Sequence, residues 1–259
     1  MHNKGKGNNR LQTFRIGQYM VKCLKSTTLK LVGYSLILKE YMMTALIGKK
    51  FDNGVLIMAD RRITYRGTDD FHDHEKKIMA LNHNAIFAFA GVKNVIDEPI
   101  EEMKAFSLQT NSLEKIEAHS QKLFSASLEF FKHSYPGHDY ATVYLLAGFA
   151  ADGTSRVTYF SSDDHFQKGH PLEFFYKTFP NTEMVYLRKY LVNEIDVSKK
   201  YIDYYIRQFS SAIRQINNQK VSKNAYSIYL SKEGLFETEI DENGRFKIIQ
   251  LEMEEHKPR

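Results

Sequence analysis

The sequence predicts an α+β domain built as a four-layer αββα sandwich, in which two antiparallel sheets lie between two pairs of helices. Three observations predict it. Strand-like and helix-like segments come in blocks, in the order strands, two helices, strands, two helices, strands. Short turn motifs join neighbouring strands, which favours antiparallel pairing. The hydrophobic content of 42% and the aromatic content of 13% are enough for a large core.

The first block of strands reads as two hairpins. The runs TALIGKKF (44–51) and GVLIMADRR (54–62) flank the motif DNG, which is a strong hairpin signal. The runs KIMAL (77–81) and AIFAFAG (85–91) flank a second turn, NHN. The apolar stretch of the last run does not alternate with polar residues, which predicts a strand buried on both faces.

Two helices are predicted next. The first covers 96–106, where Pro99 lies near the start, a position that tolerates proline. The second begins after Asn111 or Ser112 as its cap, and its apolar residues recur on one face. The motif SYPGHDY ends it.

The remaining elements repeat this pattern. A third hairpin turns at Asp152-Gly153, two further helices follow, and three strands with turns at Glu233-Gly234 and Asn243-Gly244 close the chain. The expected ranges are 141–150 and 155–162 for the hairpin, about 183–193 and 198–217 for the helices, and 225–231, 235–240 and 245–253 for the last strands.

The basic charge of the chain is concentrated at its N-terminal end. Residues 1–42 hold eight of the 36 Lys and Arg residues and one of the 31 Asp and Glu residues. The remainder therefore has 28 basic and 30 acidic side chains, a formal charge of −2. This near-neutral body argues against a nucleic-acid partner.

We therefore predict two parts, a basic leader over 1–43 and one domain over 44–259. The leader is read as a propeptide, or as the result of a start assigned upstream of Met43. Its apolar stretch, 29–38, is too short to span a bilayer, and no membrane association is expected. The only cysteine, Cys23, lies in the leader, which fits a cytoplasmic location.

One stretch carries a family resemblance. The segment MTALIGKKFDNGVLIMADRRIT, followed by KKIMALNHNAIFAFAG, resembles the start of proteasome β-type subunits, and within them the bacterial HslV-like peptidases. Those proteins are N-terminal nucleophile hydrolases with the αββα fold. The specific part of the resemblance covers 44–91, and beyond it only the order of elements is similar.

The resemblance implies four catalytic residues. Thr44 matches the nucleophile, and Asp60, sixteen residues later, matches an acid that orients a lysine. Lys77 matches that lysine by its context, whereas a strict count selects Lys76. Gly91 matches the glycine whose backbone N–H stabilises the oxyanion. No cofactor and no metal are implied.

The chemistry explains why these residue types are needed. A threonine hydroxyl needs a base to become a nucleophile. The α-amino group of an N-terminal threonine has an ordinary pKa of about 7.7–8.0, which suits a base at neutral pH. A backbone N–H at Gly91 would stabilise the tetrahedral oxyanion.

Two elements of the family pattern are missing. A Gly-Ser-Gly-type turn precedes the third helix in the family, and 178–182 reads TFPNT here. An Asp-Ser-Gly-Gly-like stretch follows the fourth helix, and 218–223 reads NQKVSK, in which at most Ser222 is retained. Two functions therefore compete: a threonine-type endopeptidase, or a catalytically inactive proteasome-like ring subunit that keeps its leader. Met43 favours the enzyme, because an initiator methionine before threonine is readily removed.

The resemblance also implies the partners. We expect protein or peptide substrates and a homo-oligomeric ring of six or seven subunits. HslV-like peptidases work with an ATPase that unfolds their substrates. Since this chain has no P-loop motif, the resemblance implies that the ATPase is a separate protein.

Other polar motifs are interpreted as structural. His72 and His74 in FHDHE lack a third metal ligand, so this stretch is read as a polar loop. The motif SSDDHF (161–166) is read as a turn rather than a catalytic triad, whose members come from distant segments.

Overall fold

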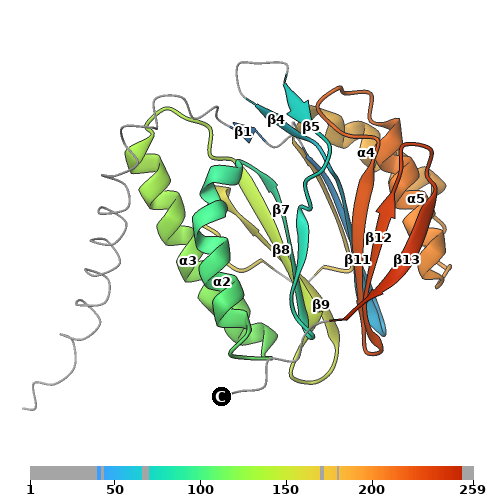
Figure 1. The fold of residues 1–259 in the computed structure, drawn as a ribbon, viewed down its shortest axis with the longest axis horizontal. Coiled ribbons are helices and arrows are strands. Elements are labelled where there is room, and N and C mark those ends of the chain that lie inside the picture. Colours follow the sequence, from blue (N-terminus) through green and yellow to red (C-terminus); the bar gives the residue numbers. More distant parts are fainter. Residues whose placement is uncertain (1–39, 42–43, 66–69, 170–171, 180, 253–259) are drawn as a thin grey trace, which may run out of the picture. The chain divides into compact units, whose positions relative to one another are not determined.

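A computed structural model describes residues 40–41, 44–65, 70–169, 172–179 and 181–252. Within this part, two large antiparallel sheets and four α-helices form the predicted αββα layers (Figure 1). Every strand pairing is antiparallel, as the hairpin turns indicate. No α-helix in these ranges is long and apolar enough to cross a membrane.

The first large sheet has six strands in the order β10-β2-β3-β11-β12-β13. The bounds are Phe174–Phe179 (β10), Thr44–Phe51 (β2), Gly54–Asp60 (β3), Ala225–Ser231 (β11), Gly234–Ile240 (β12) and Phe246–Leu251 (β13). The second large sheet has four strands, in the order β6-β7-β8-β9. The bounds are Ile78–Asn82 (β6), Ala85–Gly91 (β7), Thr142–Phe149 (β8) and Ser155–Ser161 (β9).

A pair of helices covers the outer face of each large sheet. The helices α2 (Asp97–Ser107) and α3 (Leu113–Ser134) pack on the four-stranded sheet, and α4 (Met184–Glu194) and α5 (Ile202–Gln215) pack on the six-stranded sheet (Figure 1). Ser112 caps α3 by accepting the N–H of Lys115. The last helix is shorter than the predicted 198–217.

The core consists of three apolar layers, one between the sheets and one under each pair of helices. Neighbouring residues of a strand point to opposite faces. Leu46 therefore packs between the sheets, and Ile47 packs under α4 and α5. Both faces of β3 and β7 are buried, which explains their continuous apolar runs, and β2 is buried over its first five residues.

Two features of the fold were not predicted. The strand β10 at the edge of the six-stranded sheet was missed because its partner, β2, lies far away in the sequence and no hairpin turn joins them. A small third sheet, β1-β4-β5, consists of Glu40–Tyr41, Ile63–Tyr65 and Phe71–His72. It includes two residues of the predicted leader. Residues 1–39 and 42–43 lie outside the described residues, so the domain boundary at 43 stays a prediction.

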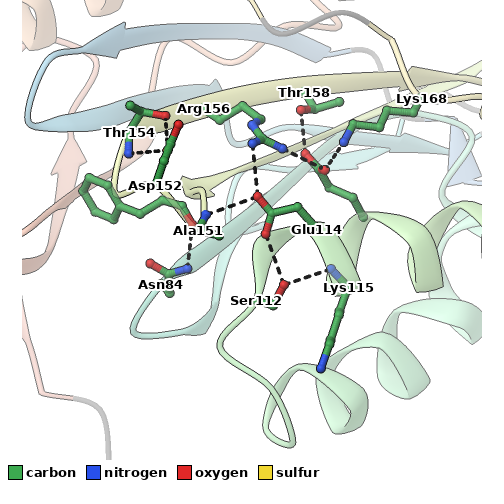
Figure 2. A network of polar contacts seen from close by, with 12 residues as sticks. Asn84, Ser112, Glu114, Lys115, Ala151, Asp152, Thr154, Arg156, Thr158 and Lys168 are labelled. Carbon is green, nitrogen blue, oxygen red and sulfur yellow. Dashed lines mark hydrogen bonds and ion pairs between the residues drawn. The ribbon is translucent and has the colours of Figure 1, made fainter.

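A buried carboxylate joins α3 to the β8–β9 side of the four-stranded sheet. Glu117 is 1% exposed, accepts the hydroxyl of Thr158 at 2.7 Å, and forms ion pairs with Arg156 and Lys168. Arg156 also forms an ion pair with Glu114, which lies one turn before Glu117 on α3 (Figure 2). These bonds hold the helix on its sheet by polar contacts as well as by packing.

Candidate active site

Asp60 lies at the end of β3 and is fully buried. Its Oδ1 accepts the amide N–H of Ala45 at 2.9 Å and the ammonium of Lys77 at 2.8 Å. Its Oδ2 accepts the amide N–H groups of Arg62 at 3.0 Å and Ser222 at 3.1 Å. Four donors from four segments therefore orient this carboxylate.

Lys77 precedes β6 and is fully buried as well. Burial lowers the pKa of Lys77 below its ordinary value, although the charge of Asp60 opposes that change. The alternative residue, Lys76, has a side chain that is 46% exposed and binds Glu237 on the surface. The structure thus brings Lys77, and not Lys76, to Asp60.

Thr44 is the first residue of β2 and is fully buried. Its neighbour, Ala45, donates the amide N–H that binds Asp60, so the threonine lies at the same end of the strands as the ion pair. Within the described ranges, the hydroxyl of Thr44 has no hydrogen-bond partner. A buried hydroxyl without a partner is costly, so its presence calls for an explanation.

Gly91 ends β7, in the sheet that faces Thr44. The preceding residue, Ala90, belongs to the same apolar cluster as Leu46 and Ala59, which follow Thr44 and precede Asp60. Gly91 has a φ of 111°, and a Cβ there would lie 2.1 Å from the carbonyl oxygen of Ala141. The position therefore requires glycine.

One segment that departs from the family pattern, 218–223, contacts the residue that follows the other, 178–182. Asn218, in the loop between α5 and β11, donates to the carboxylate of Glu183, at the start of α4, at 3.1 Å. The same loop carries Ser222, whose amide binds Asp60. The α5–β11 loop is therefore part of the site although it has no acidic residue.

Sequence reasoning missed two residues near the site. The sequence places Arg62 at the end of the strand-like run 54–62 and Asp73 in a polar loop, and neither pattern indicates a role at the site. The structure pairs them at 2.7 Å, and both side chains are mostly buried. No local pattern marks this pair, because eleven residues separate its members and the pairing of β4 with β5 brings them together.

The histidines of the same stretch stack on each other, with ring centroids 6.4 Å apart. Among the residues that the structure describes, no group of three or more His, Cys, Asp and Glu side chains is placed to hold a metal ion.

The arrangement combines a buried hydroxyl, a carboxylate and a lysine with a lowered pKa at the ends of three strands. A lysine of this kind releases its proton at a lower pH than an exposed lysine does. Together with a base, this set of a hydroxyl, a carboxylate and a lysine supports nucleophilic attack by the hydroxyl.

Comparison with models of protein families gives a match. The family model for the proteasome subunit matches residues 42–169, which is just under half of the chain. The matched stretch contains Thr44, Asp60, Lys77 and Gly91. No curated protein matches the chain.

Proposed function

We propose that this chain is a threonine-type peptidase whose nucleophile is Thr44, since the family model for the proteasome subunit matches residues 42–169. One observation carries the proposal. The hydroxyl of Thr44 is buried, has no partner within the described residues, and lies next to the amide that binds Asp60. A hydroxyl that only needs structural burial usually forms a hydrogen bond.

The proposed reaction requires Thr44 to be the first residue of the mature chain. Its α-amino group then takes the hydroxyl proton while Oγ1 attacks the carbonyl carbon of a peptide bond. The C–N bond breaks, the proton passes to the leaving amine, and an ester remains on Thr44. Water hydrolyses this ester by the same route and restores the hydroxyl.

The other site residues have supporting roles in this proposal. Asp60 holds the ammonium of Lys77, and Lys77 lowers the proton affinity of the nearby hydroxyl by its charge. Gly91 supplies its backbone N–H to the oxyanion that forms during the attack. A donor of this kind is typically worth about 2.7–4 kcal/mol in the transition state.

A second function is an inactive, proteasome-like ring subunit. One observation favours it: residues Glu40–Tyr41, before Thr44, pair with β4. In an intact chain the nitrogen of Thr44 is an amide, and no α-amino base exists. The absence of the Gly-Ser-Gly and Asp-Ser-Gly-Gly elements from 178–182 and 218–223 also favours this function.

The proposed partners follow from the family. Proteasome subunits generally assemble into rings of several subunits, and we propose a homomeric ring of six or seven copies in the cytoplasm. Its substrates are unfolded proteins or peptides, and a separate ATPase unfolds folded substrates. Light scattering tests the ring, since a species of only 30.2 kDa at micromolar concentration would contradict it.

N-terminal sequencing and a peptide-hydrolysis assay test the function. We expect the native protein to begin at Thr44, and Thr44→Ala to lose activity. Thr238→Ala, which changes a buried threonine of β12, is the matched control and keeps activity. A native chain that retains Met43, or equal activity of wild type and Thr44→Ala, refutes the enzyme and leaves the inactive subunit.

A further inference from the structure

The guanidinium of Arg62 is held on several sides. Its Nε and Nη2 donate to the two carboxylate oxygens of Asp73, each at 2.7 Å, in a bidentate pair. Its Nη1 donates to the backbone carbonyl of Gln219. The ring of Phe71 lies 3.8 Å from the guanidinium carbon. Such a pair fixes the plane of the arginine as well as its position.

These contacts join three segments that are distant in the sequence. Arg62 follows β3, Phe71 and Asp73 belong to β5 and the residues after it, and Gln219 lies in the α5–β11 loop. The Arg62 side chain is 14% exposed and that of Asp73 is 23% exposed. The pair is therefore shielded from water, unlike the exposed ion pairs that contribute little to stability.

The same contacts lead to Asp60. Arg62 donates its own amide N–H to Asp60 Oδ2, and Ser222, three residues after Gln219, donates a second amide to the same oxygen. A closed ring of bonds thus runs from Asp60 to Arg62, from the Arg62 guanidinium to the carbonyl of Gln219, and along the loop to Ser222 and back to Asp60. Asp73 fixes the guanidinium in this ring.

The ring controls one side of the catalytic carboxylate. Because a carboxylate is planar, fixing Oδ2 on the amides of Arg62 and Ser222 also fixes the direction of Oδ1. Oδ1 is the oxygen that binds Lys77 and Ala45. A loop that moved away with Ser222 would let the carboxylate rotate.

We propose that Arg62 and Asp73 are positioning residues, whose ion pair holds the α5–β11 loop so that Ser222 keeps Asp60 turned towards Lys77 and Thr44. The kinetic part of this proposal rests on the proposed peptidase function. The structural part concerns the amide of Ser222 and does not depend on activity. The α5–β11 loop has no acidic residue, and Asp73, which follows β5, supplies the negative charge that pairs with Arg62.

The test compares Asp73→Asn with Glu173→Gln in the mature protein. Glu173→Gln removes an ion pair of the same length, 2.7 Å, with Lys50 near the other end of β2. We expect Asp73→Asn to lower kcat by about 10- to 100-fold with little change of KM, by analogy with the loss of residues that orient a metal ligand. Asp73→Glu restores part of kcat, and Glu173→Gln changes neither constant.

Hydrogen exchange supplies a readout without catalysis. In Asp73→Asn we expect the backbone amides of 218–224 to exchange at least about tenfold faster, because the bond from Ser222 to Asp60 opens more often. Glu173→Gln leaves them unchanged. If wild type hydrolyses no peptide, the proposed function fails. The exchange experiment then tests by itself whether the Arg62–Asp73 pair holds the loop that carries Ser222.

A second variant covers the case in which Asp73→Asn does not fold. Arg62→Lys keeps the charge and the stem but loses the bidentate pair. We expect the same faster exchange at 218–224 and the same loss of kcat. Wild-type exchange in the folded variants overturns the proposal. Faster exchange with an unchanged kcat in an active enzyme also overturns it, because the ion pair would then hold the loop without positioning the site.

Discussion

The ammonium of Lys77 lies 2.8 Å from Oδ1 of Asp60, and both side chains are fully buried. The same oxygen binds the amide that follows Thr44. This ion pair therefore connects the start of β2, the end of β3 and the start of β6. Its complete burial distinguishes it from the surface ion pairs among the described residues.

Lys77→Met is expected to abolish peptide hydrolysis and to destabilise the fold. Removal of one partner leaves the carboxylate of Asp60 buried without its cation, which costs about 3–5 kcal/mol at such sites. Urea unfolding and a peptide assay measure the two effects. Lys76→Met is the control, with a change within about 0.5 kcal/mol, because its side chain is 46% exposed. Equal effects of the two substitutions would contradict the assignment of Lys77.

Asp73 makes stability depend on pH at the acidic end. Burial alone would raise the pKa of Asp73, but the hydrogen bonds and the charge of Arg62 prevail, so the pKa lies below its ordinary value of 3.8. The stability that Asp73 contributes is thus present above the pKa of the unfolded chain and is lost as the pH falls through the folded pKa.

Urea unfolding of wild type and Asp73→Asn at pH 6 and pH 3 measures this effect. We expect the difference in free energy of unfolding between the two proteins to be larger at pH 6. An equal difference at both pH values would show that the charge of Asp73 is not the cause.

Gly91→Ala is expected to destabilise the fold more than Gly153→Ala does. Both glycines have a positive φ, 111° and 77°, so both substitutions strain the backbone by roughly 1–3 kcal/mol. Only at Gly91 would the new Cβ also overlap a backbone atom, the carbonyl oxygen of Ala141, whereas Gly153 has no atom within 4 Å. Thermal unfolding compares the two variants. Equal melting temperatures would mean that β7 and β8 separate easily at this end.

Glu117→Gln is expected to lower the free energy of unfolding, because it weakens the contacts of α3 with its sheet. The change keeps the size of the side chain but removes the charge that Arg156 and Lys168 share, at a cost of roughly 1–3 kcal/mol. Glu129→Gln, on the same helix and 60% exposed, is the control and should have little effect. Denaturant unfolding measures both, and a Glu117→Gln protein as stable as the control would show that the network contributes nothing.

Much of the fold followed from local patterns. The turns at Asn53-Gly54, Asp152-Gly153 and Asn243-Gly244 lie where their motifs predict them, because such residues favour the conformations that tight turns need. The family pattern predicted Thr44, Asp60, Lys77 and Gly91, and the structure places Lys77 and the amide of Ala45, the residue after Thr44, on the carboxylate of Asp60. Their catalytic roles stay predictions until the assays above are done.

The sequence by itself determined the order of the elements, their antiparallel pairing and the residue types of the candidate site, because turn preferences and apolar periodicity act over a few residues. Only the tertiary structure decided between Lys76 and Lys77. Adjacent residues of an extended segment point in opposite directions. Of two neighbouring lysines, therefore, one side chain faces the site and the other faces solvent. The structure also brought Arg62, Asp73 and Ser222 together. Such long-range contacts depend on how whole layers pack, and no local pattern encodes them.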